Sequence, residues 1–401
     1  MAVPKPKHCQ HSLEDKKEKQ AFGQKSTEKM PESAEGDWSL IEAARDGRLS
    51  NVQELLESKC ANYIHRDQSG RTPLHYAAEN GNLQILCLLI EANFDINAKD
   101  NQGQTPLHIA CHYRQLEIAT CLIALGCDVN TCDIQHNTPL HRATRSNLDQ
   151  LVSVLCECGA SVNALNCCQW SPLYEAIRIG NETIISCLLD YGADINLIQR
   201  NNMSPFLTAI FYHRIASRNS YNISSILKSF IQYGSLLSHS DGVWSHLSAA
   251  VSIDQTDVGI ILILNGCRIE KRGRYSRSLL VDMFDRCETR LVKLYVLAGY
   301  PVTWDEIDQC SRRVPSFSRS FMRLVQPGSD ISSARRHLLD WLRKRIKTPC
   351  TLSEMCRTSI RSKLNEVSGD TNINPFIERL PLPKSIKAYI SMSDWISENL
   401  S

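Results

Sequence analysis

The chain has 401 residues, and its 45 lysines and arginines nearly balance 43 acidic residues, so the formal net charge is +2. This balance gives no overall field that would favour nucleic acid or an anionic membrane as the main partner. We find no apolar stretch near the N-terminus typical of a signal peptide. The longest apolar run, Val258 to Leu264, is far shorter than the roughly 20 residues that cross a bilayer. We therefore expect a soluble cytoplasmic protein that can also occupy the nucleus.

Seventeen cysteines are an unusually large and odd number. In a reducing compartment thiols stay reduced, so we expect these cysteines to pack as small buried apolar groups in preference to forming disulfides. One dense group leaves two interpretations open, a metal or redox site or simple packing with exposed turn thiols; it comprises Cys127, Cys132, His136, Cys156, Cys158, Cys167 and Cys168. The chain contains no Cys-x-x-Cys, the ligand pair that a zinc-built RING needs, and we expect no metal and no cofactor.

Residues 1–36 are rich in lysine and glutamate and are expected to form a disordered tail. After them, short segments recur every 33 residues: Thr72-Pro73-Leu74-His75, Thr105-Pro106-Leu107-His108, Thr138-Pro139-Leu140-His141, Ser171-Pro172-Leu173-Tyr174 and Ser204-Pro205-Phe206-Leu207. Thr or Ser followed by Pro is typical of a helix start, because the hydroxyl can cap the helix and Pro tolerates its first turn.

Two further residue types keep the same period. An asparagine recurs at 97, 130, 163 and 196 and is predicted to close the turn between units, and a glycine recurs at 126, 159 and 192, where it can end the second helix of a unit. The histidines at 75, 108 and 141 cannot share a metal ion, because neighbouring helix layers are roughly 8 to 10 Å apart. We predict that they form structural hydrogen bonds between units.

These residues resemble the ankyrin repeat, in which a turn and two helices stack into a solenoid. Trp38 to Ala44 aligns as an N-terminal capping unit, and degenerate units are placed at Ser245 and Ser278, which gives about eight repeats over residues 37–300. The resemblance implies an all-α fold and a protein-binding array. The sixth unit carries an insertion near Phe211 to Ser225, and insertions in solenoids often lie on the binding face. The expected substrate-binding residues are Phe211, Tyr212, His213, Arg214, Arg218 and Tyr221.

Residues 301–346 lose the period and are expected to form a basic helical linker that includes Arg335-Arg336 and Arg343-Lys344-Arg345. This basic stretch is interpreted as a solvated helix or as a surface that faces an acidic substrate or partner. Nucleic acid is not expected, because no aromatic residues are interleaved with the basic ones.

A second group of signals occupies residues 347–392. Thr351 and Glu354 have the spacing of a capping box, and the helix that follows carries apolar residues at spacings of four, namely Leu352, Cys356, Ile360 and Leu364. Farther on, the prolines of Leu380-Pro381-Leu382-Pro383 are expected to hold this tetrapeptide extended.

This segment resembles a SOCS box, a small three-helix module that follows the ankyrin array in the family of ankyrin-repeat and SOCS-box proteins. The resemblance implies that Leu352, Cys356, Ile360 and Leu364 bind elongin C and that Leu380, Pro381, Leu382 and Pro383 bind cullin-5. The expected partners are thus elongin C, elongin B, cullin-5 with its RING protein, and an unidentified target protein. Residues 393–401 are expected to be a tail.

The resemblance implies a non-enzymatic substrate receptor of a ubiquitin ligase, whose bound target is ubiquitinated and degraded by the proteasome. The alternative is an ankyrin scaffold with no degradative role. A cryptic enzyme is disfavoured, because the sequence lacks the nucleophile elbow, the zinc-protease helix, the phosphate-binding loop and the dinucleotide fingerprint.

Overall fold

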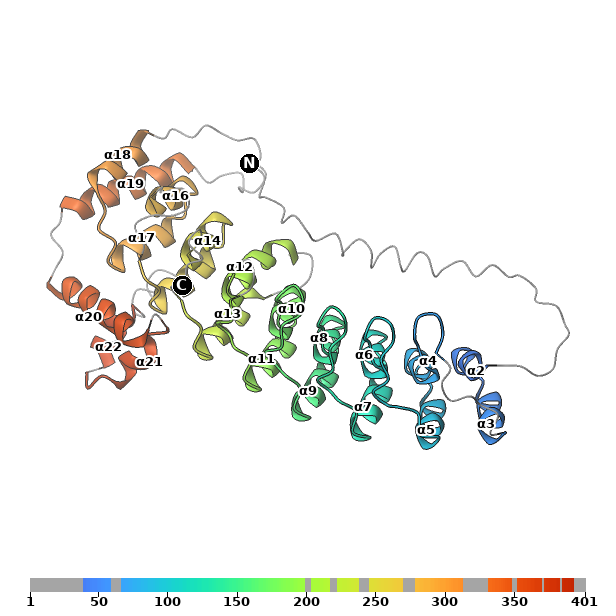
Figure 1. The fold of residues 1–401 in the computed structure, drawn as a ribbon. Helices are drawn as coiled ribbons and strands as arrows, with labels where there is room; N and C mark the ends of the chain where they lie inside the picture. The colour runs from blue at the N-terminus through green and yellow to red at the C-terminus, as the bar shows by residue number, and fades with distance from the viewer. Residues whose placement is uncertain are drawn as a thin grey trace. The chain divides into compact units, whose positions relative to one another are not determined.

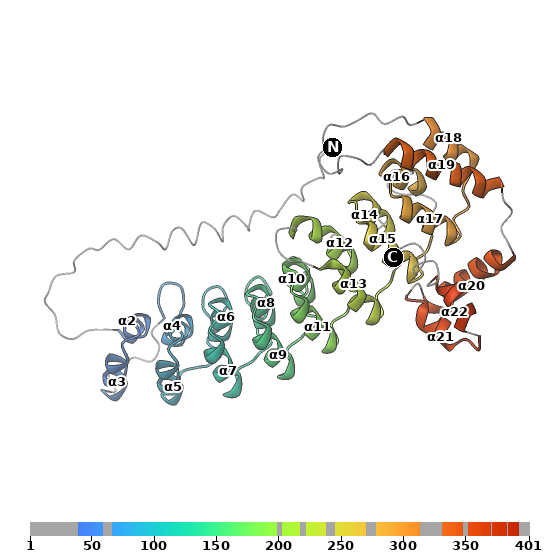
Figure 2. The ribbon, with the colours of Figure 1, turned by 180° about the vertical axis from the view of Figure 1, so that it is seen from behind.

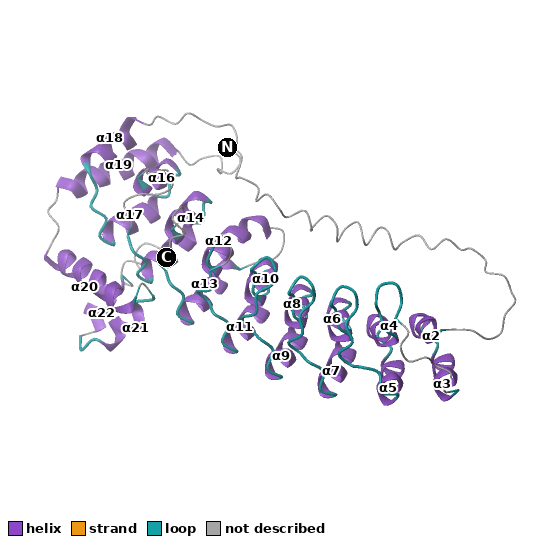
Figure 3. Cartoon of the chain, in the orientation of Figure 1, coloured by secondary structure: helices purple, strands orange, loops and turns teal. Residues whose placement is uncertain are grey.

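Between Leu40 and Leu297 the described residues form short helices that follow one another in pairs (Figure 1). This computed structural model describes residues 39–58, 66–198, 203–216, 222–237, 245–269, 278–312, 331–347, 352–369, 371–382 and 384–392. The expected tails, 1–36 and 393–401, lie outside these residues. Within the described residues every regular element is a helix, which confirms the all-α fold class (Figure 3).

The first eight pairs of the described chain have the following bounds: α2 (Leu40–Asp46) with α3 (Leu49–Glu57), α4 (Pro73–Asn80) with α5 (Leu83–Glu91), α6 (Pro106–His112) with α7 (Leu116–Ala124), α8 (Pro139–Arg145) with α9 (Asp149–Glu157), α10 (Pro172–Ile179) with α11 (Glu182–Asp190), α12 (Pro205–Ala216) with α13 (Ile223–Gln232), α14 (His246–Ser252) with α15 (Thr256–Leu264), and α16 (Leu279–Asp285) with α17 (Thr289–Leu297).

Consecutive pairs stack in register. The first helix of each pair contacts the first helices of its neighbours, and the second helices contact one another in the same way. The views in Figures 1 and 2 show two rows, one with α2, α4 and α6 and the other with α3, α5 and α7. Apolar side chains between the rows form one continuous core, so each pair depends on its neighbours for burial.

The Thr-Pro-Leu-His segments start the first-row helices α4, α6 and α8. Thr105 is the N-cap of α6 with an extended backbone, and Pro106 is the first helical residue. The backbone N–H of Thr105 donates to Nδ1 of His108 (3.2 Å), and Nε2 of His108 donates to the carbonyl oxygen of Asn137 in the next unit (3.0 Å). The predicted hydrogen bonds between units are thus confirmed, and they recur from His75 to Gln104 and from His141 to Trp170.

The repeated asparagines close the turns as predicted. Asn130 donates from Nδ2 to the carbonyl oxygen of Gly159 (3.0 Å) and accepts at Oδ1 from the backbone N–H of Ser161 (2.7 Å). Gly159 has a φ of +81°, the left-handed conformation that glycine adopts without strain. Asn163 makes the same two bonds one unit later.

Two helices lie in the segment expected to be a basic linker, namely α18 (Trp304–Arg312) and α19 (Ile331–Lys347). Helix α18 packs on α16 and α19 packs on α17, the same contacts that earlier pairs make. Leu338 and Leu342 of α19 are buried in the core of the array. These helices therefore extend the two rows by one more pair, and the exposed side of α19 carries Arg336, Arg343, Lys344 and Lys347.

The last three helices are α20 (Leu352–Ser368), α21 (Asn374–Arg379) and α22 (Lys384–Ser391). They enclose a small apolar cluster of their own, formed by Ile373, Ile377 and Ile390 with Ile360, Leu364 and Leu382 partly buried against it. We call this the isoleucine cluster and the three helices the C-terminal module. Helices α2 to α22 belong to one compact unit that starts at Leu40. None of the described helices has the length and apolar character needed to span a membrane.

The cysteines of the described residues are all free thiols. Cys111, Cys127, Cys156, Cys267 and Cys310 are buried, as expected of small apolar groups. Cys121 and Cys187 are only partly buried, and Cys132, Cys158, Cys167 and Cys168 are exposed. Among the described residues no group of three or more His, Cys, Asp or Glu side chains could hold a metal ion.

Candidate functional site: the exposed face of helix α20

Helix α20 carries the residues expected to bind elongin C, and the structure places them on different faces. Cys356 is exposed to solvent. Ile360 and Leu364 are half-buried and pack against the isoleucine cluster. Leu352 is the first residue of the helix, and its side chain lies outside the described residues. The Thr351 member of the predicted capping box is also outside them, and the Glu354 carboxylate pairs with Arg345 of α19 (2.8 Å).

Met355 completes the exposed face and was not predicted. Its side chain is 51% exposed beside Cys356, one turn after Leu352. A thioether beside a small thiol gives an apolar, adaptable surface on an otherwise polar helix face. The sequence signal was available, because a residue three positions after Leu352 lies on the same face of a helix.

The tetrapeptide that starts at Leu380 follows α21. Leu380 is extended, with φ −65° and ψ 140°, and its side chain is half-buried. The expectation that the prolines hold the tetrapeptide extended is wrong at Pro381, because the backbone N–H of Leu382 donates to the carbonyl oxygen of Leu380 (2.8 Å). This bond makes a tight turn at Pro381, whose fixed φ suits such a turn. Pro381 is exposed, Leu382 packs on the isoleucine cluster, and Pro383 lies outside the described residues.

The candidate substrate residues begin on α12, which runs for 12 residues where the other first-row helices have seven to nine. Phe211 packs against the array core, and the ring of Tyr212 meets that of Tyr174 edge to face at 6.2 Å. Only the backbones of His213 and Arg214 are described, and Arg218 and Tyr221 lie outside the described residues.

An aromatic and arginine patch adjoins Tyr212. Trp170 stacks on Tyr174 at 5.1 Å, and the guanidinium of Arg178 lies 5.1 Å from the Trp170 ring centroid. Arg178 also pairs with the fully buried Glu175 (3.3 Å). This patch was not predicted from the sequence. The available signal was Tyr174, which stands where earlier units have the histidine of Thr-Pro-Leu-His.

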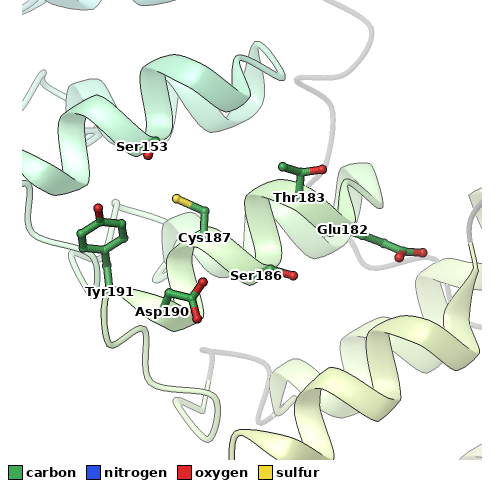
Figure 4. Close-up of a pocket in the computed structure, with 7 residues that line it drawn as sticks. All are labelled: Ser153, Glu182, Thr183, Ser186, Cys187, Asp190 and Tyr191. Atoms are coloured by element: carbon green, nitrogen blue, oxygen red, sulfur yellow. The ribbon is translucent and has the colours of Figure 1, made fainter.

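A shallow pocket lies on the second-row side, between α9 and α11 (Figure 4). Its lining residues are Ser153, Glu182, Thr183, Ser186, Cys187, Asp190 and Tyr191. Burial raises the pKa of the Cys187 thiol, which disfavours the nucleophilic thiolate, and the Glu182 carboxylate accepts a hydrogen bond from Ser225 Oγ (2.8 Å). The pocket lacks the arrangement of an activated nucleophile and a base.

Comparison with known proteins bears on both parts of the chain. The family of ankyrin repeats matches in overlapping segments, 19–100, 40–133, 85–166, 119–199 and 140–227, which together span just over half of the chain. The SOCS box family matches residues 348–391, which include all three helices of the C-terminal module.

Curated relatives match only short stretches. The human ankyrin repeat domain-containing protein 49 is 41% identical over 59 residues, which are 15% of this chain and 25% of that protein. The rice probable E3 ubiquitin-protein ligase XBOS32 is 41% identical over 68 residues, 17% of this chain and 14% of its own length. Palmitoyltransferase akr1 of Aspergillus oryzae is 35% identical over 60 residues, 15% of this chain and 8% of its own. This chain thus covers at most a quarter of each of these relatives. By its two family matches, the chain belongs to the ankyrin-repeat proteins that carry a C-terminal SOCS box.

Proposed function

We propose that this protein is the substrate-recognition component of a ubiquitin ligase that contains elongin B, elongin C, cullin-5 and a RING protein. Ankyrin repeats followed by a SOCS box indicate an elongin/cullin substrate receptor, and both are adaptor-type, non-catalytic modules. The observation that carries the proposal is the exposed Met355 and Cys356 face on the first helix of a matched SOCS box.

In this proposal elongin C binds the exposed face of α20 through Leu352, Met355 and Cys356, as an amphipathic helix binds an apolar groove. Ile360 and Leu364 support the same helix from inside the module. Residues 37–300, extended by α18 and α19, bind the target. The patch of Trp170, Tyr212 and Arg178 is a candidate contact, because aromatic and arginine side chains are enriched among residues that dominate binding energies.

Ubiquitin transfer in such a complex needs no catalytic group from this chain. The array holds the target while the C-terminal module recruits the ligase, so lysines of the target stay close to a ubiquitin-loaded conjugating enzyme. Rate enhancement then comes from proximity. The bound target is expected to be degraded by the proteasome.

The proposal is tested by comparing the full chain with a chain that lacks residues 348–391. The full chain is expected to recover elongin B, elongin C and cullin-5 from cells, together with a protein that accumulates when the proteasome is inhibited. The shortened chain should keep that protein but lose the ligase subunits. If the abundance of the captured protein changes neither when residues 348–391 are deleted nor when the proteasome is inhibited, this chain acts as a scaffold instead.

The tetrapeptide offers a separate prediction. Leu380→Ala with Pro381→Ala should lose cullin-5 and retain elongin, because Pro381 is exposed and neither residue supports the isoleucine cluster. Leu382→Ala is the comparison, because it removes a side chain from that cluster and should lower the melting temperature of the module. Co-purification and thermal unfolding measure the two effects, and joint loss of cullin and elongin in the first variant would contradict separate docking sites.

A further inference from the structure

Arg361 of α20 is a charged side chain buried at the junction between the C-terminal module and the array. It is only 5% exposed. Its Nη2 donates to the carbonyl oxygen of Ile263 in the last turn of α15 (2.7 Å), and its Nη1 donates to that of Ile390 in α22 (2.8 Å). One guanidinium group therefore joins an array helix to two helices of the module. Burial lowers the pKa of Arg361 to about 10, so it remains protonated at neutral pH.

Arg357, one turn earlier, makes an equivalent contact with the next array unit. It is 7% exposed, its Nη2 donates to the carbonyl oxygen of Leu297 at the end of α17 (2.8 Å), and its guanidinium lies 4.7 Å from the ring centroid of Tyr389. The last carbonyls of a helix lack partners within the helix and form the negative end of its dipole. Two consecutive second-row helices thus present matching acceptors to two cations spaced one turn apart on α20.

The turns that follow α15 and α17 are shaped to receive the module. A Cβ on the turn glycine of earlier units, at 126, 159, 192 and 234, would meet nothing within 4 Å. At Gly266 it would lie 2.5 Å from Cγ1 of Ile373, and at Gly299 it would lie 2.9 Å from Cγ2 of Thr358. The backbone N–H of Ile373 also donates across the junction to the carbonyl oxygen of Asn265 (3.2 Å).

We infer that Arg357 and Arg361 are positioning residues for ubiquitin transfer. They hold the helix that docks elongin C in one orientation on α15 and α17, so that the array and the bound ligase move as one body. This inference rests on the proposed function. Its consequence is that the junction decides which lysines come within reach of the ubiquitin-loaded enzyme.

The test uses the full chain reconstituted with elongin B, elongin C, cullin-5, its RING protein, a conjugating enzyme and ubiquitin. The variant is Arg357→Met with Arg361→Met, which keeps side-chain length but removes the donors. Lys363→Met is the matched control, because Lys363 is a basic residue of the same helix that is exposed and pairs with Glu366. Mass spectrometry of the lysines modified on this chain should give the same pattern for the control and the unaltered chain at every lysine other than Lys363. The double variant should spread modification to new lysines while elongin recovery stays unchanged.

A second measurement reports the junction directly. Exchange of the Ile373 amide hydrogen in the free chain should become about tenfold to a hundredfold faster in the double variant, as expected for loss of hydrogen bonds from charged donors. Arg361→Lys keeps the charge but not the planar group of five donors. Its Ile373 exchange rate should lie between those of the unaltered chain and the double variant.

The outcomes separate the two levels of the hypothesis. An unaltered chain that fails to bind elongin would reject the proposed function together with the positioning role. Normal elongin recovery with an unchanged lysine pattern and unchanged Ile373 exchange would reject the positioning role alone. Loss of elongin from the double variant but not from Lys363→Met would assign the arginines to folding of the docking helix and also reject positioning.

Discussion

Cys356→Asp is expected to lower the affinity for elongin C by at least about 100-fold and to leave the free chain folded. Cys356 is exposed on α20, so a carboxylate there stays hydrated in the unbound protein. In the proposed complex the same position enters an apolar groove, where an unpaired charge costs about 3 to 5 kcal/mol. Each 1.4 kcal/mol is a factor of ten in affinity, which gives the expected loss.

Val367→Asp provides the control for this variant. Val367 is 64% exposed on the same helix, but it lies outside the predicted docking stripe. Titration of each variant with purified elongin B and C measures the affinity, and circular dichroism measures the helix content. Val367 lies about three turns beyond Cys356, so the control tests the position along the helix. If Cys356→Asp binds elongin as tightly as the unaltered chain does, elongin does not use the surface around Cys356.

The array was predictable because its signals are local and repeated. A helix cap, a turn asparagine and a turn glycine at one period require only neighbouring residues, and the bonds of His108 and Asn130 follow from them. The degenerate units α14 to α17 lie beyond the matched ankyrin segments, yet they fold as pairs. Ser245 still caps α14, and apolar residues still fill the space between the rows.

The docking helix was predictable only in part, for a geometric reason. A spacing of four residues advances about 40° around an α-helix, so a stripe drawn from Cys356 through Ile360 to Leu364 rotates by roughly 80°. That rotation carries the stripe from the exposed face to the isoleucine cluster. The sequence alone could not locate the point where exposure ends, because this depends on where α21 and α22 pack.

The arginines of the junction were not predictable in their role. Arginine is almost never fully buried without partners, so Arg357 and Arg361 suggest a solvated face when the sequence is considered alone. Their acceptors, the carbonyl oxygens of Ile263 and Leu297, belong to the backbone and leave no trace in residue identity. The distance of about 100 residues between Arg361 and Ile263 also hides the pair from any periodic pattern.

A decrease in pH from 7 to 5 is expected to destabilise the array through its buried histidines. Burial lowers the pKa of His108 from its ordinary value of 6.5 to about 4. It also lowers the pKa values of His75 and His141. The geometry explains why, because Nδ1 of His108 accepts a hydrogen bond from the backbone N–H of Thr105 and cannot also hold a proton.

The sign of this effect follows from proton binding. Between pH 6.5 and 4 the unfolded chain takes up a proton at position 108 that the folded chain does not. The contribution of neutral His108 to the free energy of unfolding is therefore complete above pH 6.5 and is lost progressively as the pH falls to 4. For His108 the loss at pH 5 is about 2 kcal/mol of unfolding free energy. Burial alone would raise the pKa of Asp133, but hydrogen bonds from Arg142 and Asn137 outweigh it, so its own contribution is lost only at lower pH.

Urea unfolding at pH 7 and pH 5 measures this loss, and two variants identify its source. His108→Gln should be less stable than the unaltered chain at pH 7, but its free energy of unfolding should fall by about 2 kcal/mol less on acidification, because the titrating group is gone. His112→Gln is the comparison variant, because it removes an exposed histidine from the end of the same helix and leaves His108 in place. The difference in pH dependence between the unaltered chain and His108→Gln cancels the contributions of the titrating groups that both chains share. If the free energy of unfolding falls equally in all three chains, position 108 binds a proton equally well in the folded and unfolded states. That result would contradict the hydrogen bond from the Thr105 backbone N–H to Nδ1 of His108.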